Sequence, residues 1–198
     1  MLIYGAGGHA KVVVDCLIGQ QEMVSGVFDD DPAIISFMGI GVMNFYSEIF
    51  RPEEKLIVAV GNNGMRKIIS GKVSHAFGMV QHPSAEVSEH AFLGEGTVVF
   101  HKAVVQSGSH IGRQAIINTS AVVDHDCYLS DFVHIAPNST LCGGVKVGEG
   151  SLVGASAVIL PGISVGRWCT IGAGSVVVKD VPDHAVVAGN PAALLLLV

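Results

Sequence analysis

Charged side chains are scarce in this sequence, and long hydrophobic runs are absent from it. Only 14% of the 198 residues are charged, the formal net charge is −6, and Lys and Arg form no cluster. Binding to a nucleic-acid backbone needs a basic surface, so the composition argues against nucleic acid as a partner. Hydrophobic residues make up 49% of the chain, yet no apolar run approaches the roughly 20 residues that cross a bilayer. We expect no membrane association and a small-molecule ligand.

Cysteine is also rare, and the chain begins without an export signal. The four cysteines are far apart and form no CxxC pair: Cys16, Cys127, Cys142 and Cys169. This spacing argues against a disulfide framework and a structural zinc site, so we expect reduced, buried thiols, no nucleophilic cysteine and no metal. No basic region with a cleavable hydrophobic segment follows Met1, which predicts a cytoplasmic location.

The second half of the chain has a strict six-residue repeat. An aliphatic residue occurs at every sixth position from Val87 to Val177, and a small residue commonly follows four positions later. Six is an even number, so an extended strand returns the aliphatic residue to the same face at each repeat, while intervening Gly, Asn and Asp supply corners. One repeat buries nothing by itself, whereas stacked coils share a continuous core. The pattern predicts a parallel β-helix.

This repeat resembles that of the hexapeptide acyltransferases, whose left-handed β-helix uses three hexapeptides for each triangular coil. Such coils would stack residues that are three hexapeptides apart at the spacing of neighbouring strands, about 4.8 Å. Because the register is unbroken from Val87 to Val177, no long loop interrupts that span. An active site must then lie on the outside of the prism, where a neighbouring subunit can complete it.

The first third of the chain alternates predicted strands and helices. The strands are predicted at Leu2 to Tyr4, Val24 to Phe28 and Leu56 to Val60, and the helices at Val12 to Ile18 and Met65 to Val73. Alternating β and α predicts a small parallel sheet. We therefore expect a small Rossmann-like α/β domain at residues 1–82 and a left-handed β-helix with a closing segment at residues 83–198.

Residues that could bind a ligand follow each predicted strand. Gly7 and Gly8 come after the first strand, Asp29 and Asp30 after the second, and Gly61 after the third. In parallel sheets, ligands bind beyond the carboxyl ends of the strands, where glycine turns bring N–H groups to phosphate and carboxylates accept hydrogen bonds. Tight turns and strand termination also explain these residues. A domain of about 80 residues suits a single nucleotide better than NAD.

Four motifs occur in order along the chain: Tyr4-Gly5-Ala6-Gly7-Gly8-His9-Ala10-Lys11, then Asp29-Asp30, then Ala59-Val60-Gly61-Asn62-Asn63 with Arg66, then Asp124-His125-Asp126-Cys127. Together they resemble the sialic-acid and nucleotide-sugar acetyltransferases, which include the bacillosamine and perosamine N-acetyltransferases, over nearly the whole chain. The resemblance implies an acetyl-CoA-dependent N-acetyltransferase that acts on a nucleotide-linked amino-dideoxy sugar, such as a UDP-4-amino sugar, in glycan biosynthesis. It also implies a homotrimer with acetyl-CoA between adjacent subunits.

The same resemblance implies roles for individual residues. The nucleotide sugar would be held by Gly7, Gly8, His9, Asp29, Asp30, Gly61, Asn62 and Asn118. Acetyl-CoA would contact His134, Gly143, Ala155, Gly172 and Ala173. Relatives often carry a lysine after the closing Pro-Ala pair, but here Ala193 and a run of leucines follow it. The corresponding contact with the coenzyme phosphates is not expected.

Acetyl transfer to an amine needs a base and donors that stabilise the oxyanion of the tetrahedral intermediate. His125 is the best candidate base, because its unperturbed pKa of about 6.5 suits proton transfer and an adjacent carboxylate raises its basicity. Asp126 is the expected carboxylate; Asp124 is the alternative, and in a regular strand both would point away from His125 unless the chain turns a corner. Gly143 follows three hexapeptides later and should stack above His125, leaving space for the thioester and offering an N–H to the acetyl carbonyl.

Three other functions share parts of this pattern. An O-acetyltransferase of sialic acid or another sugar would use the same base on a hydroxyl, but the predicted nucleotide pocket disfavours it. A β-helical carbonic anhydrase needs three zinc-binding histidines, and His101, His125 and His134 lack suitable spacing. A noncatalytic nucleotide-sugar sensor would have no use for the Asp124-His125-Asp126 motif.

Overall fold

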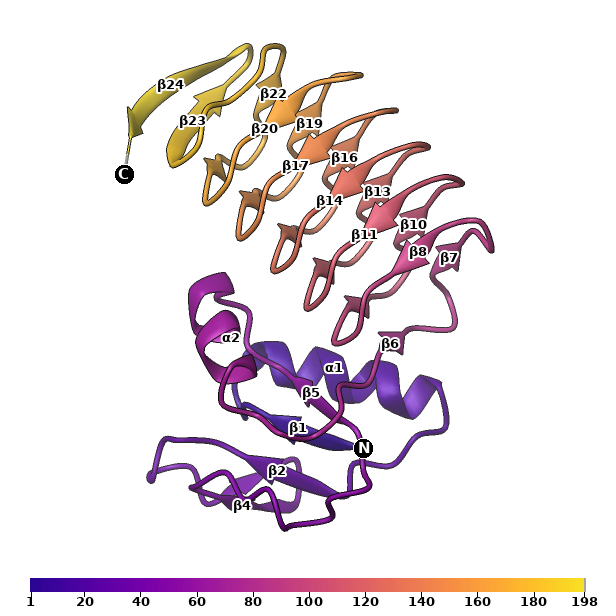
Figure 1. Ribbon diagram of the computed structural model, residues 1–198, viewed down its shortest axis with the longest axis vertical. Helices are drawn as coiled ribbons and strands as arrows, with labels where there is room; N and C mark the ends of the chain where they lie inside the picture. Colours follow the sequence, from indigo (N-terminus) through magenta and orange to yellow (C-terminus); the bar gives the residue numbers. More distant parts are fainter. Residues whose placement is uncertain (198) are drawn as a thin grey trace.

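The computed structural model describes residues 1–197, and its first part is a five-stranded sheet with two helices (Figure 1). The strand order is β3-β4-β2-β1-β5, and all neighbours are parallel except β3 and β4. The bounds are β1 Leu2–Tyr4, β2 Gly26–Phe28, β3 Ser36–Phe37, β4 Ile40–Met43 and β5 Leu56–Val58. Strands β1, β2 and β5 fall within the predicted ranges, whereas the β3–β4 hairpin was not predicted.

Helix α1 (Gly8–Gly19) begins before the predicted helix, because the glycine turn itself forms its first turn. Helix α2 (Asn63–Ser70) also begins early, since the Asn62 Oδ1 accepts a hydrogen bond from the Met65 N–H at 2.9 Å and so caps the helix. This helix ends at Ser70 and the chain turns at Gly71, short of the predicted end at Val73.

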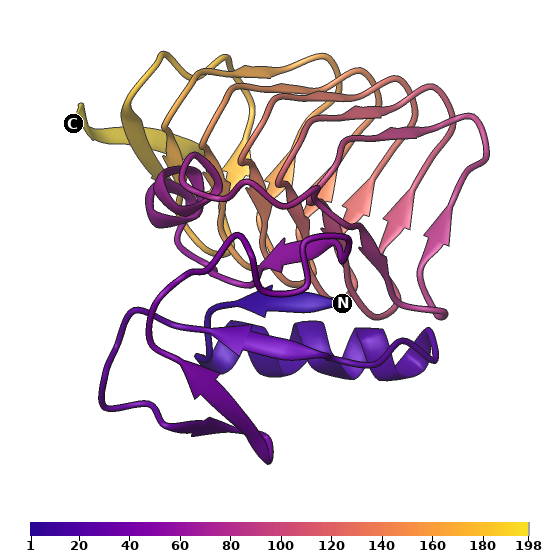
Figure 2. The same ribbon diagram turned by 60° about the horizontal axis from the view of Figure 1, so that its bottom comes forward.

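Side chains alternate across the N-terminal sheet, so each face has its own core. Ile3 and its neighbours face α1, while Leu2 and Tyr4 face the side that contains Ile69 of α2. The far side of α1 packs on the β-helix, whose Phe100 belongs to the same buried cluster. Figure 1 shows α1 between the first coils of the β-helix and the strands β1, β2 and β4, and Figure 2 shows it running alongside β1. This packing joins the two parts of the chain.

The second part is a parallel β-helix with three sheets, which we name by number. Sheet I contains β22 (Val176–Val177), β19 (Val158–Ile159), β16 (Thr140–Leu141), β13 (Val122–Val123), β10 (Val104–Val105) and β7 (Glu86–Val87). Sheet II contains β20 (Ser164–Val165), β17 (Lys146–Val147), β14 (Tyr128–Leu129), β11 (His110–Ile111) and β8 (Phe92–Leu93). Sheet III contains β24 (Ala192–Leu197), β23 (Ala185–Gly189), β21 (Thr170–Ile171), β18 (Leu152–Val153), β15 (His134–Ile135), β12 (Ile116–Ile117), β9 (Val98–Val99) and β6 (Val80–Gln81).

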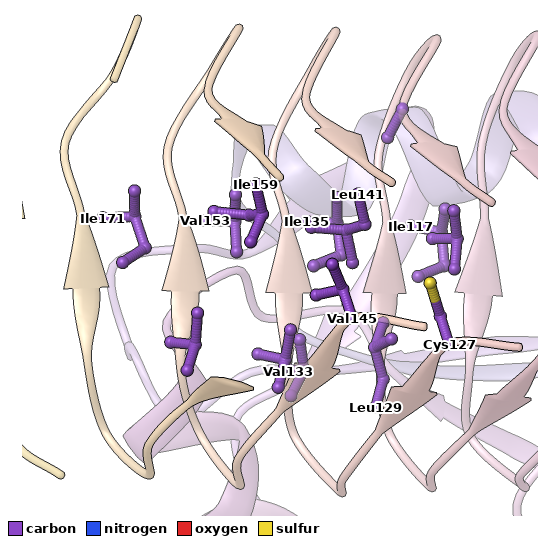
Figure 3. Packing of buried hydrophobic residues seen from close by; sticks show 14 of the residues in the cluster. Ile117, Cys127, Leu129, Val133, Ile135, Leu141, Val145, Val153, Ile159 and Ile171 are labelled. Atoms are coloured by element: carbon purple, nitrogen blue, oxygen red, sulfur yellow. The ribbon is translucent and has the colours of Figure 1, made fainter. Parts of the chain in front are cut away.

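The predicted six-residue register is confirmed. The repeated aliphatic residue is the second residue of every strand from β7 to β22, and paired strands are offset by one coil of three hexapeptides, as in Ile117 with Ile135. Figure 3 shows these side chains stacked in the interior. Almost all are buried, and full burial of such a side chain stabilises the fold by roughly 1.5–3 kcal/mol. The β-helix therefore folds around one continuous aliphatic core.

Four-residue corners connect the sheets, and we name each by the sheets that it joins. The small residue predicted at each corner points inward, and where it is polar its hydroxyl is satisfied: the Ser109 Oγ donates to the Asp124 carbonyl at 2.6 Å, and the Ser151 Oγ to the Gly166 carbonyl at 2.7 Å. The third corner residue is commonly left-handed, with φ +58° at Asp126. This sharp turn, rather than glycine itself, defines the corner.

The β-helix ends in a hairpin on sheet III. Strand β23 pairs in parallel with β21, and β24 returns antiparallel to β23. The leucines predicted to be unusual lie on β24, where Leu194, Leu195 and Leu196 are each half exposed or more.

At the other end of the β-helix, β6 already belongs to sheet III, so the proposed domain boundary at residue 82 falls just after the first β-helix strand. None of the helices within residues 1–197 has the length and apolar character that a bilayer span needs.

Candidate active site

His125 and Asp126 form an ion pair on an exposed corner. They lie between β13 and β14, at the corner of sheets I and II, and the His125 Nδ1 is 2.8 Å from the Asp126 Oδ2. The left-handed conformation of Asp126 turns its carboxylate back toward the preceding ring, so the objection from regular strand geometry does not apply. Asp124 contacts the His125 backbone instead, where its Oδ1 accepts from the N–H at 2.8 Å. The geometry favours Asp126 as the partner of the ring.

The carboxylates around His125 increase its basicity. The hydrogen bond that the His125 ring donates to Asp126 is the largest cause of its raised pKa, and the nearby charge of Asp124 acts in the same direction. Because the Nδ1 is held by Asp126, the Nε2 is the ring nitrogen available to a substrate. His125 is therefore a solvent-accessible imidazole with one oriented nitrogen and enhanced proton affinity.

Gly143 faces the His125 ring one coil further along the β-helix. A Cβ added to Gly143 would lie 2.6 Å from both the Cε1 and the Nε2 of His125, closer than any real contact allows. The Gly144 N–H donates to the His125 carbonyl at 2.9 Å, which fixes this stacking, whereas no carbonyl accepts from the Gly143 N–H among the described backbone hydrogen bonds. Only glycine at position 143 lets the His125 ring lie this close to the next coil.

A second cluster lies where α1 and α2 meet sheet III. His9, in the first turn of α1, has its ring 6.5 Å from that of His134 and against Gly61. The Asn118 Nδ2 lies 3.0 Å from the His134 Nε2. The structure thus brings together four residues predicted for the substrates, from both parts of the chain.

The two histidines of this cluster are held uncharged. Burial, and after it the positive charge of Arg66, lower the pKa of His9 to about 4 and that of His134 to about 3. His134 is also repelled by His9, while a backbone hydrogen bond to Gly61 acts in the opposite direction. Both rings are therefore neutral near pH 7, unlike the basic His125: His134 hydrogen-bonds with Asn118, whereas the His9 Nε2 is buried without a hydrogen-bond partner among the described residues.

The predicted glycine and aspartate residues lie at the carboxyl edge of the N-terminal sheet. Gly7 and Gly8 begin α1 with open space above both α-carbons, so a ligand phosphate can approach the helix N-terminus. The carboxylates are already engaged within the protein: the Asp29 Oδ2 accepts from the Ala6 N–H at 2.7 Å, and the Asp30 Oδ1 accepts from the Tyr4 hydroxyl at 2.6 Å. Asp29 therefore shapes the glycine turn, whatever else it binds.

A cavity of about 240 Å³ connects this cluster with the upper coils. It is lined by Gly61, Asn62, Asn63, Gly64, His134, Gly150, Leu152, Trp168, Cys169 and Thr170. Trp168 and Thr170 in its wall were not singled out by the sequence, because only the folded corner brings them beside α2. Within the described residues, no group of three or more His, Cys, Asp or Glu side chains could hold a metal ion.

The residues predicted to contact acetyl-CoA divide between two edges of the prism. Gly143 lies at the corner of sheets I and II with His125, whereas Ala155, Gly172 and Ala173 lie at the corner of sheets III and I. Asn118 also lies at that second edge, and His134 on sheet III beside it. The width of sheet I thus separates His125 from the second cluster within one chain. The fold does not bring the two halves of the predicted site together in a single subunit.

Comparison with known proteins shows the family to which this chain belongs. Residues 1–73 match the family model of the PglD N-terminal domain, and residues 144–179 match that of the bacterial transferase hexapeptide (six repeats). The GDP-perosamine N-acetyltransferase of Escherichia coli O157:H7 is 30% identical over 168 residues, which are 79% of this chain and 76% of that protein. The chain belongs to the PglD-type family of hexapeptide-repeat sugar acetyltransferases. It also matches serine acetyltransferases of Arabidopsis thaliana, but spans only 40% to 55% of their length.

Solved structures of the sugar acetyltransferases agree with this assignment. PerB from Caulobacter crescentus, in complex with CoA and GDP-perosamine, has a TM-score of 0.92 and 40% identity, covering 98% of this chain and 95% of that one. The acetyltransferase domain of PglB from Neisseria gonorrhoeae FA1090, in complex with acetyl coenzyme A, has a TM-score of 0.89 and 40% identity, covering 98% of each chain. The resemblance first seen in four motifs is confirmed along the whole fold.

Proposed function

We propose that this protein transfers the acetyl group of acetyl-CoA to the amino group of a nucleotide-linked amino-dideoxy sugar, such as a UDP- or GDP-linked 4-amino sugar. The observation that carries the proposal is the exposed His125–Asp126 pair, whose imidazole lies directly against Gly143 of the next coil. Relatives that share the fold act on GDP-perosamine and bind CoA or acetyl-CoA. His134, which the resemblance assigned to acetyl-CoA, lies in one cluster with His9 and Asn118, and we propose that it serves the nucleotide sugar instead. Gly7, Gly8 and the His9–His134 cluster are then the acceptor side.

In this mechanism His125 acts as the general base. Its Nε2 takes a proton from the sugar amine as the nitrogen attacks the thioester carbonyl, and Asp126 stabilises the imidazolium that forms. The Gly143 N–H donates to the oxyanion of the tetrahedral intermediate. When the intermediate collapses, the C–S bond breaks, the new C–N bond remains, and the proton passes to the CoA thiolate. The products are the acetamido sugar and CoA.

A homotrimer would unite the two halves of the site. Sheet I is the outer face suited to packing, because half-buried aliphatic residues follow one another along it: Val104, Val122, Val158 and Val176, with Thr140 between them. Sheet III is covered in part by α1, and sheet II carries polar and aromatic side chains. Three copies packed through sheet I would place His125 of one subunit beside Asn118 and Ala155 of the next. The proposed acetyl-CoA groove lies between them.

The function is tested by a thiol-release assay with acetyl-CoA and a panel of UDP-, GDP- and dTDP-linked 4-amino sugars, with free sialic acid for comparison. We expect turnover of one nucleotide sugar and none of sialic acid. Turnover of sialic acid alone would establish an O-acetyltransferase instead. Binding of a nucleotide sugar without turnover of any acceptor would support a sensor and refute the proposal.

The shared site is tested by mixing subunits. His125→Ala and Asn118→Ala chains should each be inactive as homotrimers, but trimers formed by co-expression should recover part of the wild-type activity, because some interfaces then combine an intact His125 with an intact Asn118. Val122→Glu should dissociate the trimer in analytical ultracentrifugation, whereas Ser164→Glu on sheet II should not. A complementation result of zero from stable mixed trimers would show that each subunit works alone.

A further inference from the structure

Arg66 is a buried arginine without an acidic partner. Its side chain is 1% exposed, and no carboxylate of residues 1–197 forms an ion pair with it. Burying an unpaired guanidinium is costly unless all its donors are satisfied. Here they are satisfied by four backbone carbonyls and one side-chain amide oxygen, which belong to Gln114, Val60, Gly61, Asn63 and Phe132.

These contacts cross the boundary between the two parts of the chain. The Nε donates to the Gln114 carbonyl at 2.8 Å and one terminal nitrogen to the Phe132 carbonyl at 2.9 Å, both on corners of sheets II and III. The other terminal nitrogen donates to the carbonyls of Val60 and Gly61, at 3.0 and 3.2 Å, in the turn after β5. The planar guanidinium group of Arg66, called the fork below, therefore fixes the Gly61 turn against two coils of the β-helix.

The Gly61 turn continues into the proposed acceptor side. Gly61 and His134 line the same cavity. The Asn118 amide lies 3.0 Å from the His134 Nε2, which must accept its N–H. Arg66, Gly61, His134 and Asn118 thus form a chain of neighbouring groups, whose His134–Asn118 hydrogen bond requires a neutral imidazole.

The charge of Arg66 acts on the same chain. Arg66 and His9 are the charged and titratable groups that face His134, and both oppose its protonation. A protonated His134 would have no lone pair to accept the Asn118 N–H, so the arrangement depends on a neutral ring. A neutral hydrophobic residue in place of Arg66 would remove both the fork and this repulsion.

We propose that Arg66 is a positioning residue of the acceptor site, which holds the Gly61 turn and the His134–Asn118 pair in one arrangement across the domain boundary without touching the substrate. The inference rests on the proposed function, because it assigns this cluster to the nucleotide sugar. It explains why a full positive charge is buried beside two histidines. It also separates Arg66 from residues that only dock α2 on the β-helix.

Lys67 provides the matched control. It is the next residue of α2 and also bridges the two parts of the chain, through an ion pair with Glu149, but it is half exposed and forms no hydrogen bond with Gly61 or His134. The variants to compare are Arg66→Met, which removes fork and charge, Arg66→Lys, which keeps a charge but not the planar fork, and Lys67→Met. Each is measured for kcat and for the KM of both substrates.

For Arg66→Met we expect the KM for the nucleotide sugar to rise about tenfold or more, with a smaller rise for Arg66→Lys, because charged hydrogen bonds are lost. The KM for acetyl-CoA should stay within about twofold, and Lys67→Met should resemble the wild type in both constants. Equal rises in both KM values, or the same effect from Lys67→Met, would reduce Arg66 to a docking residue and overturn the proposal.

A measurement without substrate keeps the inference independent of the reaction. In long-range ¹H–¹⁵N NMR spectra at pH 6, His134 should be a single neutral tautomer in the wild type and in Lys67→Met. In Arg66→Lys, which lacks the planar guanidinium, the pKa of His134 should be higher than in the wild type. In Arg66→Met, which also lacks the charge, it should be higher still. Unchanged His134 signals in folded Arg66→Lys and Arg66→Met would overturn the positioning role. If no acceptor turns over, the proposed function fails, while this spectroscopic result still decides the role of Arg66.

Discussion

Acidification should destabilise this protein through His9 and His134. In the folded state, burial holds both rings neutral, with pKa values of about 4 and about 3. In the unfolded state each would titrate near 6.5. The unfolded chain therefore binds more protons between these limits, so stability present above about pH 6.5 is lost as the pH falls, until each folded pKa is reached.

The expected loss follows from the difference between folded and unfolded pKa values. At pH 5 an unfolded histidine is about 1.5 pH units below its pKa, while both folded rings remain mostly neutral. At about 1.4 kcal/mol per unit, each ring contributes a loss of about 2 kcal/mol relative to pH 8. The sum of about 4 kcal/mol is an upper figure, because His9 and His134 repel each other and are not independent.

Urea unfolding at pH 8 and pH 5, at one fixed protein concentration, measures this loss. On acidification, His134→Gln should lose less stability than the wild type by the contribution of one ring, about 2 kcal/mol, whatever its stability at pH 8. The exposed His90→Gln serves as the control and should match the wild type. His125, whose pKa is raised, acts in the opposite sense, so the comparison uses differences between variants. If His134→Gln and the wild type lose the same amount, the neutral-ring argument is refuted.

Three further predictions concern single positions. His125→Ala should lower kcat by roughly 10²- to 10⁴-fold with little change in the dissociation constant of CoA by calorimetry; near-normal turnover would exclude it as the base. Gly143→Ala should displace the His125 ring and lower kcat by at least about tenfold, with thermal unfolding nearly unchanged; full activity would show that the position of the ring against Gly143 is not required. Asp29→Ala should cost about 1–3 kcal/mol of stability, because the Ala6 N–H loses its acceptor, and should raise the KM for the nucleotide sugar but not for acetyl-CoA; an effect on the acetyl-CoA KM alone would contradict this.

The fold could be predicted from the sequence where one physical rule decides it. The aliphatic residue at every sixth position must face inward in any coil built from short strands, so positions such as Ile117 and Ile135 followed directly. The His125–Gly143 contact followed from the same spacing of three hexapeptides. The sequence pattern predicted helix ends less well: α2 begins earlier than predicted because Asn62 caps it.

The rest depends on how the two parts of the chain pack. Arg66 belongs to one of the four motifs, but the hydrophobic pattern around it does not predict its burial, which arises only when α2 meets the β-helix. The His9–His134 proximity has the same origin. The Asp29–Asp30 pair shows the opposite problem: the residue types suit a ligand, but the structure shows that their carboxylates already accept hydrogen bonds from the protein.

The contact between His125 and Gly143 also constrains how the gene can change in length. Each coil is a module of three hexapeptides, and whole modules can be duplicated or deleted in a solenoid without disturbing the inward register. A module inserted between Asp126 and Gly143 would put a different corner over the imidazole, although the core would remain intact. Duplications in that interval would be eliminated by selection for activity rather than for folding.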